Sequence, residues 1–180
     1  MVRQRPTVAR HTQRTLLVVG EGDCEVAFLN HLRGLYAARG CGVRVTLRNA
    51  HGKGPEHVVD FAVRQCRSAD YDLRAALLDT DLPWPPRITR DARARRILLI
   101  PSDPCLEGLL LHILDRTVPE TSNACKRALR AVLDGRPTAA PSYVPLFDRV
   151  LLEKHRRSVR SLAWLLDLFE GKHPSKEDIP

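Results

Sequence analysis

The sequence is poor in aromatic residues and contains no long apolar run. Phe, Trp and Tyr together make up 5% of the 180 residues. No stretch approaches the roughly 20 consecutive apolar residues that a membrane-spanning helix needs, and residues 1–14 lack the apolar segment of a secretory signal. With 43% hydrophobic and 28% charged residues, the composition is typical of a folded domain and not of a disordered chain. We therefore expect a soluble, cytoplasmic protein that does not enter a membrane.

The cysteines and histidines form no metal-binding or disulfide motif. The histidines His51 and His57 do not have the i, i+4 spacing that places two ligands on one helix face. No Cys-x-x-Cys pair occurs, and the cysteines are odd in number and widely spaced: Cys24, Cys41, Cys66, Cys105 and Cys125. This spacing argues against a disulfide framework and against a zinc knuckle. We expect reduced thiols and no structural zinc.

Basic residues outnumber acidic ones and are unevenly distributed. There are 29 Lys plus Arg against 21 Asp plus Glu, which gives a formal net charge of +8 and a pI near 9.7. A polyanion such as a nucleic acid is the natural partner of such a chain, although a solvated basic surface is an alternative interpretation. Arginines concentrate within residues 1–14, 87–96 and 154–160. The predicted nucleic-acid-binding residues are Arg93, Arg95, Arg96, Arg156 and Arg157.

Strand and helix signals alternate over the first two thirds of the chain. Apolar, β-branched runs predict strands at 16–19, 43–47, 73–79 and 97–100. Helical periodicity predicts helices at 23–39, 55–67 and 104–114, with a short polar helix or loop at 87–95. This order is typical of an α/β fold with a mostly parallel central sheet flanked by helices.

After about residue 118 the pattern becomes helical throughout, with predicted helices at 122–133, 143–152 and 155–170. The expected organisation is a basic N-terminal arm (1–14), an α/β domain (15–118) and a helical C-terminal extension (119–180).

Acidic residues follow two of the predicted strands. Glu21 comes just after the first strand, between two glycines, and Asp79 and Asp81 lie at the end of the third. Because the carboxyl ends of parallel strands share one edge, where ligands bind, these side chains are expected to lie together. In an extended chain, residues two apart point the same way, a spacing suited to a hard divalent cation. Turn-forming aspartates and a solvent-facing glutamate are the alternative interpretation. Glu25 could join this group or be an ordinary first-turn helix carboxylate.

A third segment connects the fourth strand to the next helix. Asp103 is predicted to cap this helix and Pro104 to be its first residue. A capping box would then need Glu or Gln at position 106, which is leucine, so Glu107 is free to face the same crevice.

His112 and Lys53 each allow a structural and a functional interpretation. His112 follows in an apolar stretch, where a core or rim histidine is the alternative to a catalytic one. Lys53, in a glycine-rich loop, could contact a phosphate or be a solvated lysine.

Taken in order, these segments resemble the RloB-like branch of the TOPRIM superfamily over about residues 16–114. The matching motifs are Glu21-Gly22-x-x-Glu25, Asp79-Thr80-Asp81, and Ser102-x-Pro104-Cys105-x-Glu107 with His112. The resemblance implies a Rossmann-like TOPRIM domain in which Glu21, Asp79 and Asp81 hold Mg²⁺ or Mn²⁺. It also implies a role in host defence or restriction, with a protein partner from such a system. Thr80 and Leu106 depart from the family pattern, in which a basic and an aromatic residue are usual.

The predicted function is therefore that of a metal-dependent nuclease that hydrolyses DNA or RNA. Its predicted catalytic residues are Glu21, Asp79, Asp81 and Glu107, and the supporting candidates are Glu25, Lys53, Ser102 and His112. The alternative is a non-catalytic nucleic-acid-binding module or subunit. Nucleotidyl transfer ranks lower because the sequence shows no additional catalytic domain. A dinucleotide-binding enzyme ranks lower still, because carboxylates stand where a pyrophosphate would lie.

Overall fold

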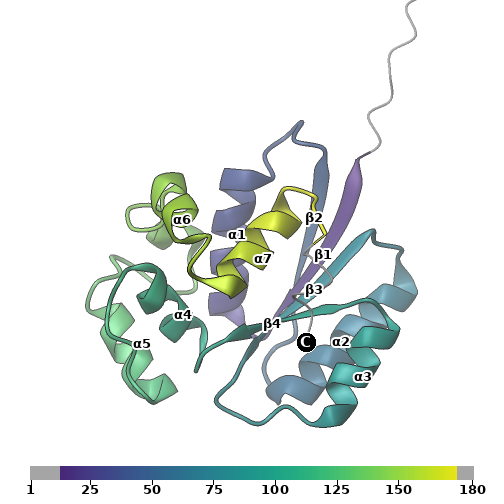
Figure 1. Ribbon diagram of the computed structural model, residues 1–180, viewed down its shortest axis with the longest axis horizontal. Helices are drawn as coiled ribbons and strands as arrows, with labels where there is room; N and C mark the ends of the chain where they lie inside the picture. The colour runs from purple at the N-terminus through teal and green to yellow at the C-terminus, as the bar shows by residue number, and fades with distance from the viewer. Residues whose placement is uncertain (1–12, 174–180) are drawn as a thin grey trace, which may run out of the picture.

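A four-stranded sheet lies at the centre of the computed structural model, which describes residues 13–173 (Figure 1). The strands are β1 (Arg14–Gly20), β2 (Val43–Asn49), β3 (Leu73–Asp79) and β4 (Leu98–Ser102). They are arranged in the order β2-β1-β3-β4, and every neighbouring pair is parallel. The predicted α/β fold with a parallel sheet flanked by helices is confirmed, and its arrangement is Rossmann-like.

Alternating side chains of the strands build two separate apolar cores. In β1, Leu16 and Val18 belong to one core and Leu17 and Val19 to the other, as the two-residue period of a strand requires. The second core is covered by α2 (Gly54–Ser68) and α3 (Pro86–Ala94). The first, larger core is covered by α1 (Asp23–Tyr36), α4 (Leu106–Ile113) and the helices that follow α4 (Figure 1).

The helices of the C-terminal extension belong to this larger core. They are α5 (Ser122–Arg130), the 3₁₀ helix η1 (Ala140–Tyr143), α6 (Arg149–His155) and α7 (Arg160–Phe169). Phe28 of α1 packs edge-on against Tyr143 and Phe147, with ring centroids 5.4 and 5.7 Å apart. The extension therefore shares its apolar core with the first helix of the α/β part.

Several predicted boundaries differ in the structure. The last predicted helix, 155–170, begins only at Arg160, because α6 ends at His155. The helix predicted at 143–152 is split: η1 ends at Tyr143, and α6 begins at Arg149. Asp148 caps α6 by accepting a hydrogen bond from the Leu151 amide at 2.8 Å, and Pro145 lies in the break, where proline disfavours a continuous helix.

At the N-terminus, Arg14 is the first residue of β1 and not part of a separate arm. Residues 1–12 of the predicted basic arm lie outside the described residues. Within residues 13–173, no helix is both long and apolar enough to cross a membrane.

Candidate functional site

Five carboxylates gather at the carboxyl edge of the sheet, and we refer to them as the acidic cluster. Glu21 follows β1, Asp79 is the last residue of β3 and Asp81 follows it, whereas Glu25 and Glu107 lie in the first turns of α1 and α4. Glu25 and Glu107 are only 8% and 6% exposed. Glu21 and Asp79 are half-buried, and Asp81 is exposed. The structure thus brings together all four predicted catalytic residues and Glu25.

Glycine at position 20 allows Glu25 to approach the end of β1. A Cβ atom at Gly20 would lie 2.8 Å from the Cβ of Glu25, closer than two carbons can pack. The carboxylate of Glu25 accepts a hydrogen bond from the Gly22 amide at 2.8 Å. Gly22 is the N-cap residue of this helix, and the Asp23 carboxylate accepts a hydrogen bond from the Asn49 side chain at 2.7 Å.

Asp79 is fixed by contacts on both its backbone and its side chain. Its carbonyl oxygen accepts a hydrogen bond from Trp84 Nε1 at 2.9 Å. Its Oδ1 accepts one from the backbone amide of Leu106, the first residue of α4, at 3.0 Å. The free amides at a helix N-terminus favour a negative group. The carboxylate is therefore held in one orientation at the start of α4.

The start of α4 differs from the prediction that Asp103 caps the helix. The N-cap residue is Cys105. Asp103 Oδ1 instead accepts a hydrogen bond from the Thr80 hydroxyl at 2.8 Å, and the Pro104 carbonyl accepts the amides of Thr80 and Asp81 at 3.0 Å. Asp103 and Pro104, joined by a cis peptide bond, therefore form a turn that ties the end of β3 to α4.

Asp81 also lies in a different backbone conformation from the one expected. β3 ends at Asp79, and the chain bends through residues 80–82, so the two aspartates are not consecutive same-face positions of one strand. The Asp81 carboxylate accepts a hydrogen bond from the Ser122 hydroxyl of α5 at 2.7 Å. A residue of the C-terminal extension thus reaches the acidic cluster.

Burial and, after it, mutual repulsion disfavour the ionised form of the carboxylates in the cluster. Burial, followed by the charges of Glu25, Glu21, Asp81 and Glu107, raises the pKa of Asp79 to about 8. Burial also raises the pKa of Glu21 and of Glu25, and neighbouring carboxylates add to both shifts. Like charges in a desolvated site disfavour ionisation. A proton or a cation would therefore relieve the cluster.

Ser102 adds an unused polar group beside Asp79. The two residues are paired in the register of β3 and β4. Ser102 is fully buried, and within the described part of the chain its Oγ has no hydrogen-bond partner. Such orphaned buried hydroxyls are uncommon and call for an explanation such as a missing ligand or water.

The cluster's donor atoms fit a hard divalent cation. Carboxylate and hydroxyl oxygens are what Mg²⁺ and Mn²⁺ prefer. In residues 13–173, no three potential ligands already stand together as a ready-made coordination shell. To bind a cation, the carboxylate side chains would have to move closer to one another. Their mutual repulsion opposes this movement, and the charge of the cation would offset that repulsion.

Sequence reasoning missed Ser122 and Lys126, which both come from α5. Burial acts to lower the pKa of Lys126, but attraction from Glu107, Cys105, Asp79 and Glu25 outweighs it and raises the pKa. No local motif marks either residue. The four-residue spacing on a short amphipathic helix was the only sign that both could face one way.

The two remaining supporting candidates lie beside the cluster. Lys53 follows β2 at the same edge of the sheet, and the neighbouring Gly52 amide donates to the Glu21 carbonyl at 2.8 Å. Lys53 has a positive φ of 75°, an uncommon conformation for a residue with a side chain. His112 is exposed near the end of α4 and lines a pocket of about 220 Å³ together with Asp103 and Arg160. His112 is therefore in an adjacent pocket and not in the cluster.

Three of the predicted nucleic-acid-binding residues lie at the opposite edge of the sheet. Arg93 is near the end of α3, and Arg95 and Arg96 precede β4. Arg93 and Arg96 line a pocket of about 230 Å³ with Leu73 and Leu98, the first residues of β3 and β4. Since β3 has seven residues, its two ends are about 20 Å apart. These arginines and the acidic cluster therefore cannot contact the same phosphate.

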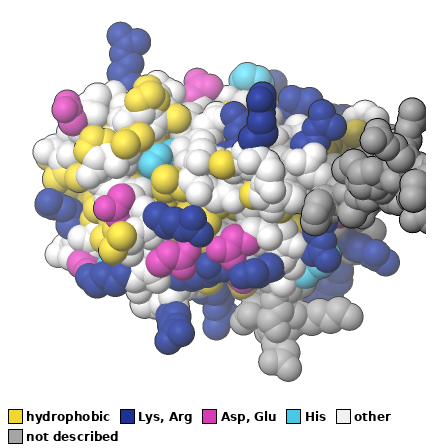
Figure 2. All heavy atoms as spheres, turned by 90° about the horizontal axis from the view of Figure 1, so that it is seen from above, with side chains coloured by type: hydrophobic (Ala, Val, Ile, Leu, Met, Phe, Trp, Pro, Cys, Tyr) yellow, Lys and Arg dark blue, Asp and Glu magenta, His cyan; other side chains and the backbone are white. Residues whose placement is uncertain are grey.

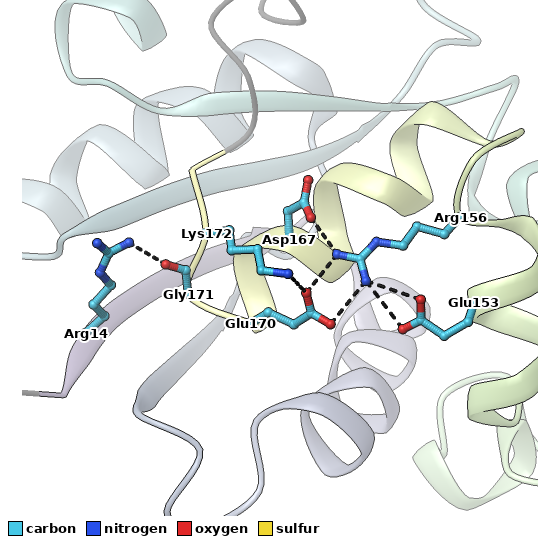
Figure 3. A network of polar contacts seen from close by, with 7 residues as sticks. All are labelled: Arg14, Glu153, Arg156, Asp167, Glu170, Gly171 and Lys172. Atoms are coloured by element: carbon cyan, nitrogen blue, oxygen red, sulfur yellow. Dashed lines mark hydrogen bonds and ion pairs between the residues drawn. The ribbon is translucent and has the colours of Figure 1, made fainter. Parts of the chain in front are cut away.

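Arg156 and Arg157 differ in their surroundings although they are adjacent. Arg156 Nη2 lies 2.5 Å from Asp167 and 2.8 Å from Glu170, and Nη1 lies 3.2 Å from Glu153 (Figure 3). The side chain of Arg156 is only 20% exposed, so this guanidinium joins α6 to α7.

Arg157 is exposed and shares with Arg160 an open pocket of about 680 Å³. On the face shown in Figure 2, basic side chains are spread widely, with acidic ones among them.

Comparisons with protein-family models, with curated proteins and with solved structures found no match. The resemblance to the RloB-like branch therefore stays a prediction, and the functional argument rests on the geometry of the acidic cluster.

Proposed function

We propose that this chain is a metal-dependent nuclease of the TOPRIM type. The observation that supports it most directly is the position of Asp79, a half-buried carboxylate at the carboxyl edge of a parallel sheet with four other carboxylates around it. Gathering like charges costs folding free energy, and such arrangements concentrate at functional sites. A divalent cation is the ligand that offsets this cost.

In this proposal Glu21, Asp79 and Asp81 hold Mg²⁺ or Mn²⁺, with Glu107 near a second metal position. A cation bound there would neutralise charge on a phosphodiester and lower the pKa of an attacking water. Burial raises the pKa of Glu21, and this direction favours the alternative role of Glu21 as a general acid or base in place of a metal ligand. Trp84 and the Leu106 amide hold Asp79 in place, and such preorganisation lowers the cost of reaching the reactive geometry.

Nucleic acid is the proposed substrate because of the net charge of +8 and because arginines lie at the edge of the sheet where the strands begin. The exposed Arg95, Arg96 and Arg157 would contact phosphates away from the reacting one. All five cysteines are free, which agrees with the proposed cytoplasmic location. A role in host defence, with a protein partner from such a system, is the part of the proposal that rests on the resemblance alone.

The test is cleavage of labelled single-stranded and duplex DNA and RNA with Mg²⁺, Mn²⁺ or EDTA. Asp79→Asn/Asp81→Asn should lose metal-dependent cleavage by about 10³-fold or more while remaining folded, because the cation would lose two of its three proposed ligands. Asp134→Asn, which changes an exposed aspartate outside the cluster, is the matched control. Full cleavage by the folded double variant would refute the proposal.

A non-catalytic nucleic-acid binder is the second candidate, and the separation of Arg95 and Arg96 from the acidic cluster favours it. Binding through these residues should fall steeply with salt and need no divalent ion. Binding that is unchanged by EDTA, without cleavage of any of the four substrates, would support this candidate.

A further inference from the structure

Helix α5 is held against the acidic cluster by a polar contact and by the burial of apolar residues. The Ser122 hydroxyl donates to Asp81 Oδ2 at 2.7 Å. Cys125 and Leu129 are fully buried in the larger core, and Cys125 Sγ donates to the Pro119 carbonyl at 3.1 Å. These contacts fix the rotation of α5 about its own axis.

That rotation turns Lys126 toward the cluster. Ser122 and Lys126 are four residues apart in α5 and therefore share a face. Lys126 is attracted by Glu107, Asp79 and Glu25, yet within residues 13–173 no carboxylate lies at ion-pair distance from it. Its side chain is exposed. The ammonium group is near the cluster but is available to an incoming anion.

We propose that Lys126 contacts the phosphate of the substrate at the acidic cluster, alongside the cation that the carboxylates hold. This inference rests on the proposed nuclease function and adds a substrate-binding residue to it. A phosphodiester brings negative charge to a site that already contains five carboxylates, so the attraction must come from nearby cations. A lysine ammonium is a compact point charge that suits this task.

A purely structural role for Lys126 predicts a different effect on substrate binding. If Lys126 only neutralised the carboxylates, its loss would leave cation-dependent binding of the oligonucleotide undiminished. In either role the ammonium group repels the cation while substrate is absent. Its removal should then tighten Mn²⁺ binding about 3- to 10-fold, as Coulomb's law gives for one unit charge a few ångströms away.

The experiment compares wild type, Lys126→Met, Lys126→Arg and Arg127→Met. Arg127 is exposed and lies about 200° around the helix from Cys125, so Arg127→Met removes the same charge from a side that faces away from the core. Mn²⁺ affinity is measured by calorimetry. Binding of labelled single-stranded DNA and RNA is measured with Ca²⁺ and with EDTA, and the difference gives the cation-dependent part.

Lys126→Met should bind Mn²⁺ more tightly and lose about tenfold in cation-dependent oligonucleotide binding. Lys126→Arg should restore most of that binding, and Arg127→Met should match wild type in both measurements. If Lys126→Met keeps the cation-dependent oligonucleotide binding of wild type, or binds Mn²⁺ no more tightly than wild type, this inference is overturned and the proposed function is left standing. A wild-type protein that binds no Mn²⁺ would overturn both.

Discussion

Asp79 and Ser102 are paired residues on neighbouring parallel strands, and both belong to the strand face that α1 and α4 cover. The Asp79 carboxylate accepts one hydrogen bond, from the Leu106 amide. The Ser102 hydroxyl is buried without a partner in the described residues. Together they place unused oxygen atoms on the same side of the sheet, where the cation is proposed to bind.

Ser102→Ala should therefore weaken metal binding without lowering the stability of the fold. Removing an unsatisfied buried hydroxyl should leave stability unchanged or raise it by about 1 kcal/mol. The same change should weaken Mn²⁺ binding severalfold if Ser102 Oγ helps to hold the ligand. Urea unfolding in EDTA and calorimetric Mn²⁺ titration measure the two effects. A variant that is clearly less stable, with unchanged Mn²⁺ affinity, would show that Ser102 only fills space.

Trp84 donates a hydrogen bond to the Asp79 carbonyl, so the fluorescence of Trp84 should report cation binding at the acidic cluster. The other tryptophan, Trp164, is almost fully buried in the larger core. Paramagnetic Mn²⁺ should quench the fluorescence of Trp164→Phe, which retains Trp84, much more than that of Trp84→Phe. Mg²⁺, which is diamagnetic, should quench neither. Equal quenching of the two variants by Mn²⁺ would place the cation away from Asp79.

Gly108 allows α4 to pack against the turn at residues 103–104. A Cβ at this position would lie 2.5 Å from the Asp103 carbonyl oxygen, a backbone atom that cannot move aside easily. Gly108→Ala should cost about 2–4 kcal/mol, as forced overpacking does. Gly34→Ala in α1 is the matched control, because nothing lies within 4 Å of its added Cβ, and it should stabilise the helix by about 0.5–1 kcal/mol. Thermal and urea unfolding of the two variants should shift in opposite directions.

The ion pairs of Arg156 predict how the stability of the fold depends on pH. Hydrogen bonding to Arg156, followed by hydrogen bonding to Lys172 and the positive charges of both residues, lowers the pKa of Glu170 to about 2. A carboxylate whose pKa is lower in the folded state stabilises the fold above its unfolded pKa, near 4.5, and loses this effect as the pH falls toward 2. Glu170→Gln should cost roughly 1–3 kcal/mol at pH 7.

The difference in stability between wild type and Glu170→Gln should shrink steadily from pH 5 to pH 2. Urea unfolding at intervals of half a pH unit measures it. Glu120→Gln, at an exposed glutamate, controls for the general effect of removing a carboxylate. A difference that stays constant over this range would mean that the ion pair does not form in solution.

Much of the acidic edge could be predicted from sequence, because buried strands are short apolar runs with clear ends. β3 was predicted to end at Asp79 and does so. The sequence also indicated where Arg95 and Arg96 lie. They directly precede a predicted strand, and in a parallel sheet the starts and the ends of the strands lie at opposite edges. Their separation from Asp79 was therefore implied by the sequence.

The contacts that complete the site could not be predicted, because they join distant parts of the chain. Asp103 has the local signature of a helix cap, but the Thr80 hydroxyl binds its carboxylate, and the helix begins later. Ser122 reaches Asp81 across 41 residues, and the burial of Cys125 and Leu129 in the larger core helps to determine how α5 is turned. Local patterns do not encode such packing.

The side chain of Arg14, in the first strand, donates to the carbonyl of Gly171, beyond the last helix (Figure 3). A Cβ at Gly171 would lie 2.7 Å from a methyl group of Val43, the first residue of β2. Both ends of the described chain thus meet where the strands begin, about 20 Å from the acidic cluster. A circular permutant that joins these ends through a short linker and opens the chain at the exposed Gly135 turn should keep the fold. An affinity label on that linker would leave the carboxyl edge accessible to a long polymer.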